Sequence, residues 1–162
     1  MDLIGQLNSL GIDVNCKFHY INHGGCAVYA AIVGKELRDM GVNTKVLIAA
    51  NMWGPRTTVD EARKHVKSVK KKEHWRANGI FFGHVGLEFW WERRKYHYDS
   101  NGCHKPEKTL DNCQIYKGRM TVDECIALAR ERSGWNESFN RRHIPVLRKM
   151  VARHFNEMKA MA

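Results

Sequence analysis

The segment Asn22-His23-Gly24-Gly25-Cys26 runs directly into the apolar stretch Ala27-Val28-Tyr29-Ala30-Ala31-Ile32-Val33 and decides how the chain is organised. It places a cysteine after two glycines, at the start of a helix that the apolar stripe predicts over residues 26–40. The helix dipole favours a thiolate at such a position, and glycines permit backbone angles that other residues resist. The segment therefore predicts that Cys26 is a nucleophile, held in place by a helix packed on the core.

The sequence ahead of this segment predicts a short amphipathic helix over residues 2–11. Leu3, Leu7 and Leu10 lie at helical spacing, and Gly11 is a typical helix end. Residues 12–21 show no regular period and predict an irregular connection.

Three apolar runs after the cysteine helix predict strands. Residues 45–50 predict a buried strand, and residues 80–91 and 95–99 predict an antiparallel hairpin around the polar residues between them. In such a hairpin residue i faces roughly 186 − i, so His84 is expected near the level of Asp99.

The C-terminal part, residues 120–162, is predicted to be helical. Capping boxes at Thr58–Glu61 and Thr121–Glu124 predict two helix starts, the first opening a lysine-rich helix over 58–73 that is interpreted as solvent-exposed. The last helix is predicted to begin near Pro145. Its predicted core face consists of Ile144, Leu147, Val151, Phe155 and Met158.

The composition indicates one domain, residues 1–162, with reduced thiols. A chain of 162 residues with 43% hydrophobic content buries one good core. Its five cysteines are an odd number at irregular spacing, and no signal peptide or membrane-length apolar run is apparent. We expect a cytoplasmic protein that does not contact membranes. The net charge of +10 is compatible with nucleic-acid binding, but without a nucleic-acid motif this is possible and not favoured.

The strands supply partners for Cys26. His84 lies on the most apolar strand between Gly83 and Gly86, with room for the cysteine helix or a substrate. Asp99, near the end of the neighbouring strand, is placed to accept the imidazole N–H and orient the ring. This arrangement predicts acyl transfer, with Cys26 as the nucleophile, His84 as the base and Asp99 as the orienting group.

An oxyanion-binding and substrate-binding role is predicted for the turn that precedes the helix. The backbone N–H of Cys26 faces the developing oxyanion, together with the side chain of Asn22 or His23. Asn22 is slightly favoured, and Gly25 belongs to the same predicted site.

Three short motifs resemble the papain-like cysteine peptidase superfamily: Gly24-Gly25-Cys26 opening a helix, Gly83-His84-Val85 on a strand, and Tyr98-Asp99-Ser100-Asn101-Gly102 closing the next. Their compact order is most similar to the transglutaminase-like branch and to small phage-encoded members. The resemblance covers roughly residues 20–102 and implies an α+β, papain-like fold, with the cysteine helix packed on an antiparallel sheet. It implies the roles given above for Cys26, His84 and Asp99, and the host cytoplasm for a phage-encoded protein.

The chain also departs from papain. Papain has a glutamine several residues before its cysteine, where this chain has Phe18-His19-Tyr20-Ile21-Asn22, and no tryptophan follows Cys26. The oxyanion donor and the subfamily therefore remain open at this point.

The predicted function is a thiol-dependent hydrolase of the cysteine peptidase type. It cleaves a peptide or isopeptide bond of a protein or peptide substrate through a thioester, and it needs no cofactor. Two alternatives stay open: a transglutaminase or acyltransferase using the same triad, and an inert basic module that binds nucleic acid or protein.

Other cysteine and tryptophan residues have alternative interpretations. A zinc site is conceivable from Cys16 and His19 with Cys103, His104 and Cys113, although the spacings match no compact zinc pattern. A bond between Cys103 and Cys113 is disfavoured in a reducing compartment, and Cys125 is interpreted as structural. The tryptophans line a substrate groove or belong to the core; these are Trp53, Trp75, Trp90 and Trp91.

Overall fold

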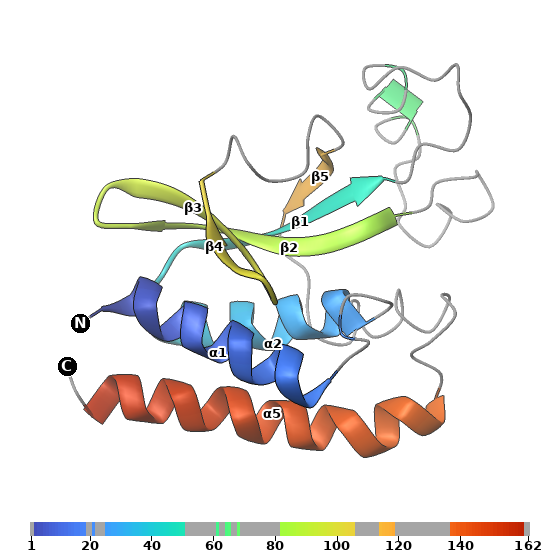
Figure 1. Ribbon diagram of the computed structural model, residues 1–162. Helices are drawn as coiled ribbons and strands as arrows, with labels where there is room; N and C mark the ends of the chain where they lie inside the picture. Colours follow the sequence, from blue (N-terminus) through green and yellow to red (C-terminus); the bar gives the residue numbers. More distant parts are fainter. Residues whose placement is uncertain are drawn as a thin grey trace.

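The computed structural model shows an α+β protein in which helices pack on one face of an antiparallel sheet (Figure 1). It describes residues 2–18, 21, 25–50, 61, 64–65, 68, 82–105, 114–118 and 137–160, with side chains described for all of these except 48–50, 82–83, 114–118 and 137–141. The elements are α1 (Leu3–Lys17), α2 (Cys26–Asp39), β1 (Thr44–Ala50), β2 (Phe82–Trp91), β3 (Arg94–Asp99), β4 (Gly102–His104), β5 (Gln114–Gly118) and α5 (Glu137–Ala160). The predicted α+β class is confirmed.

The five-stranded sheet has the order β4-β3-β2-β1-β5, and each neighbouring pair is antiparallel. The predicted hairpin is β2–β3, whose register pairs Leu87 with Tyr98, one residue away from the expected register. Glu92 and Arg93 both have positive φ, which fits a tight hairpin turn that follows the right-handed twist of the strands. The hairpin lies at the centre of the sheet and carries His84 and Asp99 on adjacent strands.

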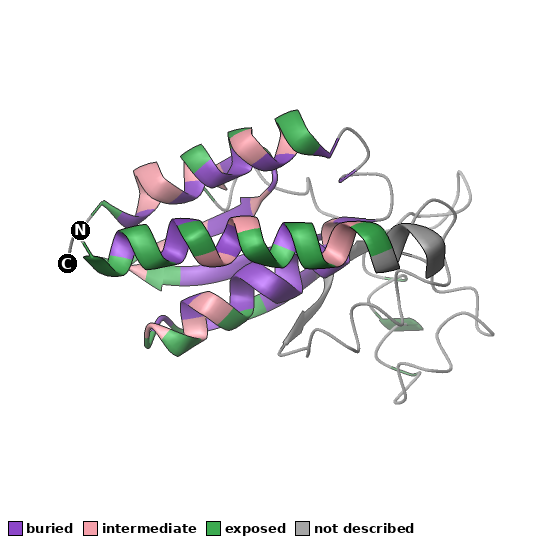
Figure 2. Cartoon of the chain, turned by 90° about the horizontal axis from the view of Figure 1, so that it is seen from below, coloured by how far each residue is buried: buried purple, intermediate pink, exposed green. Residues whose placement is uncertain are grey.

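The core lies between the sheet and the helices. Val85, Leu87 and Phe89 alternate along β2 and are fully buried. Helix α2 lies between the sheet and α5, and its residues are buried nearly all round (Figures 1 and 2). A helix that is apolar on most of its surface is typical of such a doubly covered position. The helix that begins at Cys26 is therefore held from both sides.

Helix α1 is longer than predicted. It continues through Gly11 to Lys17, so the predicted end at Gly11 and the irregular connection directly after it are wrong. Gly11 serves a close approach: a Cβ there would lie 2.8 Å from the carbonyl oxygen of Ser100. Gly11 therefore does not end the helix; it lacks a side chain because the turn at Ser100, distant in sequence, packs closely against it.

The C-terminal helix also differs from the prediction. Helix α5 begins at Glu137, so Pro145 lies inside the helix and the predicted start there is wrong. Pro145 is exposed, so the missing backbone donor lies on the solvent side, where bending is tolerated. The predicted core face is confirmed: Leu147, Val151, Phe155 and Met158 are fully buried and Ile144 packs against them in part.

Between β4 and α5 the described part of the chain contains one strand that the sequence analysis did not predict. This strand, β5, pairs with β1. The helices predicted over 58–73 and from Thr121 lie outside the described residues, apart from helical positions at 61, 64–65 and 68. Across the part of the chain that is described, no helix has the length and apolarity needed to cross a bilayer.

Candidate active site

His84 and Asp99 meet across the β2–β3 pair. The imidazole Nε2 of His84 lies 2.9 Å from Oδ2 of Asp99, and the side chains are 20% and 10% exposed. Gly86 lies between them on β2, and a Cβ there would come within 2.9 Å of the Tyr98 carbonyl oxygen. The strands therefore bring the predicted base and orienting group into direct contact as diagonal neighbours on adjacent strands.

Cys26 reaches the same imidazole from the first position of α2. Its partly buried side chain lies close to His84, near enough for the thiol to contribute to the raised pKa of the imidazole. Because Nε2 of His84 faces Asp99, Nδ1 is the ring nitrogen left for Cys26. The structure thus places His84 between Cys26 and Asp99, so all three residues that the sequence singled out lie together.

The turn before Cys26 is described only at Gly25. Gly25 is buried and forms the N-cap of α2 with φ of −88° and ψ of −14°, an ordinary right-handed conformation that does not require glycine. Asn22 and His23, predicted as oxyanion groups, and Gly24 lie outside the described residues.

The electrostatics of the site favour a charged imidazole. Burial by itself would lower the pKa of His84, but the hydrogen bonds and negative charges of Asp99 and Cys26 outweigh burial and raise the pKa of His84 to about 10. Burial likewise opposes ionisation of Asp99, yet its bonds to His84 and to the Asn101 N–H leave the pKa of Asp99 lowered. Both shifts favour a charged His84 imidazolium beside a charged Asp99 carboxylate.

Helix α1 supports the turn that follows Asp99. The Asn15 amide donates to the Ser100 carbonyl at 2.6 Å, and the backbone N–H of Cys103 donates to Oδ1 of Asn8 at 2.7 Å. Sequence reasoning missed both asparagines. The sequence did offer a sign of their role: Asn8 and Asn15 are two helical turns apart, on the side of α1 that also carries buried leucines.

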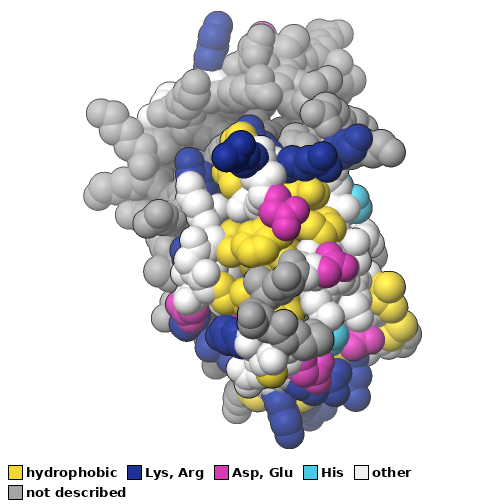
Figure 3. Space-filling view, turned by 90° about the vertical axis from the view of Figure 1, so that its left-hand side faces the viewer, with side chains coloured by type: hydrophobic (Ala, Val, Ile, Leu, Met, Phe, Trp, Pro, Cys, Tyr) yellow, Lys and Arg dark blue, Asp and Glu magenta, His cyan; other side chains and the backbone are white. Residues whose placement is uncertain are grey.

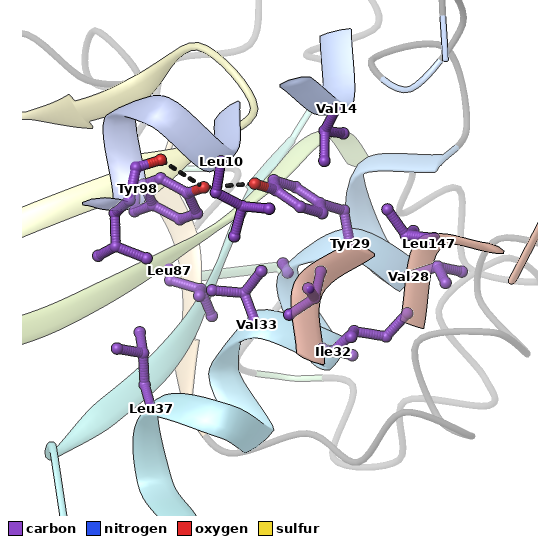
Figure 4. Close-up of a cluster of buried hydrophobic side chains, with 14 of the residues drawn as sticks. Leu10, Val14, Val28, Tyr29, Ile32, Val33, Leu37, Leu87, Tyr98 and Leu147 are labelled. Carbon is purple, nitrogen blue, oxygen red and sulfur yellow. Dashed lines mark hydrogen bonds between the residues drawn. The ribbon is translucent and has the colours of Figure 1, made fainter. Parts of the chain in front are cut away.

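Two buried tyrosines link the cysteine helix to the strand of Asp99 (Figure 4). Tyr29 lies one helical turn after Cys26, Tyr98 directly precedes Asp99, and their hydroxyl groups form a hydrogen bond. Tyr98 also donates to the Leu7 carbonyl of α1 at 3.0 Å. Burial raises the pKa of both tyrosines above the usual range, so both hydroxyls are neutral donors. Sequence reasoning missed this pair as well.

The remaining described cysteines differ from Cys26. Cys16 is exposed on α1. Burial, together with the nearby charge of Asp99, raises the pKa of Cys103 to about 12, so this residue is a neutral thiol at neutral pH. Cys26 differs from both in lying beside His84, whose pKa it helps to raise.

The described tryptophans lie away from this contact, towards the hairpin end of β2. Trp90 is exposed with the Lys95 ammonium 5.3 Å from the centre of its ring, and Trp91 packs partly on the core. Trp53 and Trp75 lie outside the described residues.

Figure 3 looks at the end of the molecule that carries the hairpin turn, where Lys and Arg side chains are interspersed with Asp and Glu. The positive charge on this face does not form an uninterrupted patch.

No three His, Cys, Asp or Glu side chains in the described ranges are grouped so as to hold a metal ion. His19 and Cys113 of the conceivable zinc set lie outside those ranges, so that alternative is untested at those two positions.

No protein-family model, curated protein or solved structure matches the chain.

We expect Gly102→Ala to destabilise the turn after Asp99. Gly102 has φ of +104°, and a Cβ would lie 2.7 Å from Oδ1 of Asn8. Left-handed backbone and steric conflict together should lower the free energy of unfolding by about 2 kcal/mol or more in urea titrations. Gly41→Ala is the matched control, because Gly41 has φ of +81° with nothing within 4 Å of a Cβ. Equal losses in both variants would contradict a specific contact with Asn8.

The raised pKa of His84 predicts a pH dependence of stability. A group whose pKa is raised from 6.5 to about 10 on folding stabilises the protein fully below the unfolded value, and this contribution is lost as the pH rises through the folded value. The difference in unfolding free energy between the wild type and His84→Gln should therefore be largest near about pH 6 and decline towards about pH 10. Urea titrations across this range test the sign; a difference that grows with pH would contradict it.

Proposed function

We propose that this chain is a thiol-dependent hydrolase of the cysteine peptidase type, which cleaves an amide bond of a protein or peptide through Cys26, His84 and Asp99. The observation that carries the proposal is the placement of His84, 2.9 Å from Asp99 and close enough to Cys26 for the thiol to affect its pKa. Nucleophile, base and orienting group in contact are what covalent acyl transfer requires. The three motifs also occur on the elements that a papain-like fold would use, and we include that fold in the proposal.

The proposed reaction begins from the thiolate–imidazolium pair. Sγ of Cys26 forms a bond to the carbonyl carbon of the substrate, and as the C–N bond breaks the His84 imidazolium gives its proton to the leaving nitrogen. This yields a thioester and a neutral imidazole. His84 then takes a proton from water, whose oxygen attacks the thioester, and the carboxylic acid leaves as the thiolate and imidazolium are restored.

Two features of the described residues suit this sequence of steps. Asp99 retains its negative charge next to His84 throughout, which stabilises the imidazolium and fixes the tautomer of the neutral ring. Cys26 is the first residue of α2, so its side chain and an oxyanion formed beside it lie at the positive end of the helix dipole.

Turnover of pooled peptide amides and isopeptides tests the proposal. We expect Cys26→Ala to abolish turnover, whereas Cys16→Ala, which changes an exposed cysteine on α1, retains it. In H₂¹⁸O the acid product of the wild-type protein should carry one ¹⁸O atom. An amine adduct in place of the acid would identify an acyltransferase with the same triad. Unchanged turnover in Cys26→Ala would contradict both forms of the proposal.

A further inference from the structure

The two oxygens of the Asp99 carboxylate have separate partners. Oδ2 faces Nε2 of His84 at 2.9 Å. Oδ1 accepts the backbone N–H of Asn101 at 2.7 Å and lies 3.4 Å from Nε2 of His104. A carboxylate held at one oxygen by two donors is fixed in orientation about its own bonds, which leaves the other oxygen directed at a single partner.

The backbone of His104 is held in place by elements on either side. His104 ends the three-residue strand β4, pairs with His97 of β3 and is thereby a diagonal neighbour of Asp99 on the same face of the sheet. The preceding residue, Cys103, donates its N–H to Asn8 of α1. The turn and α1 together therefore fix the position of the His104 backbone, and with it the point from which the side chain extends.

Exposure increases outward through this group. The His104 side chain is 30% exposed, against 10% for Asp99. His104 faces Oδ1, the carboxylate oxygen that does not face His84, and is more exposed than Asp99 itself. A side chain there can be changed without opening the buried core.

We propose that His104 is a positioning residue, which holds Oδ1 of Asp99 so that Oδ2 stays directed at His84. This inference rests on the proposed function of Cys26, His84 and Asp99. His104 acts through Asp99 and does not contact the reacting atoms. It extends the contact sequence to Cys26, His84, Asp99 and His104, four side chains from α2, β2, β3 and β4.

The alkylation of Cys26 by iodoacetamide at about pH 6 tests this inference without a known substrate. We expect His104→Ala to slow this alkylation by about two- to tenfold, the effect of one ordinary hydrogen bond. His104→Gln keeps an N–H donor and should restore most of the rate. The urea midpoints of both variants should match the wild type, which separates positioning from general destabilisation.

A spectroscopic readout reports on the Asp99–His84 contact directly. The His84 Nε2 proton should give a downfield resonance in the wild type, which shifts upfield or broadens in His104→Ala and returns in His104→Gln. If His104→Ala leaves both this resonance and the alkylation rate unchanged, or speeds alkylation, the inference is overturned. Equal slowing in His104→Ala and His104→Gln would also overturn it, because the effect would then come from loss of the imidazole ring and not from loss of an N–H donor to Asp99.

These readouts separate the inference from the proposed function. If no amide is cleaved by the wild-type protein, the proposed function fails, but the His84 resonance still shows whether His104 orients Asp99. If Cys26-dependent cleavage is found and the His104 variants leave the resonance unchanged, the inference alone fails.

Discussion

His84→Ala is expected to reduce amide turnover by about 10³-fold or more, close to the loss caused by Cys26→Ala. The imidazole lies 2.9 Å from Asp99 and close to Cys26, so in the proposed mechanism its removal leaves the thiol without a base and the leaving group without an acid. Asp99→Asn should cost about 10²-fold or more, because an amide stabilises the imidazolium poorly and permits the wrong tautomer.

Turnover numbers of single and double variants measure this effect. If the residues act as one unit, the double variant Cys26→Ala/His84→Ala should be no slower than either single variant. His65→Ala changes an exposed histidine and is expected to keep wild-type turnover. A His84→Ala protein that retains most of its turnover would show that another group activates Cys26.

Tyr98→Phe is expected to be the most destabilising of the conservative changes near the site, by about 2–3 kcal/mol. Tyr98 donates to the Leu7 carbonyl and accepts from Tyr29, so its removal breaks both bonds and leaves the buried Tyr29 hydroxyl unsatisfied. Tyr29→Phe should cost only about 1 kcal/mol, because the Tyr98 hydroxyl keeps its acceptor on α1.

Urea titrations of the two single variants and the double variant test this order. In Tyr29→Phe/Tyr98→Phe no buried hydroxyl is left without a partner. The loss of unfolding free energy should therefore be smaller than the sum of the losses in the two single variants. Ile12→Ala, at an exposed position on α1, is the control and should change stability by less than about 0.5 kcal/mol. Additive losses, or a larger loss in Tyr29→Phe than in Tyr98→Phe, would contradict the hydrogen-bond direction.

The parts of the fold that follow local rules could be predicted from the sequence. The helix that begins at Cys26, the β2–β3 hairpin and the core face of α5 depend on hydrophobic period, and the structure confirms them, although α2 is buried on more sides than a single stripe. The meeting of His84 and Asp99 followed from the hairpin register. Cys26 was assigned to His84 and Asp99 from the chemistry that a nucleophile needs and from the resemblance; no local pattern could place it beside them, because its position depends on how α2 packs on the sheet.

The errors and omissions arise from contacts between residues distant in sequence. Gly11 reads locally as a helix end, yet its role is set by Ser100 against α1. His104 and Asn8 look unremarkable until β4 turns back along β3 and α1 packs against it. Strand β5 is defined by its pairing with β1, which no local pattern specifies. Long-range pairing is therefore where sequence reasoning fell short.

The most direct test of the central claim, that Cys26 and His84 form an activated pair, is the pH profile of Cys26 alkylation by iodoacetamide. Free thiols such as N-acetylcysteine lose reactivity below a pKa of about 8.5, and serve as the reference in the same solution. The activated pair predicts that Cys26 still reacts as a thiolate near about pH 6, and that this reactivity is lost in His84→Ala. A Cys26 profile that follows the free thiol and is unchanged in His84→Ala would contradict the claim.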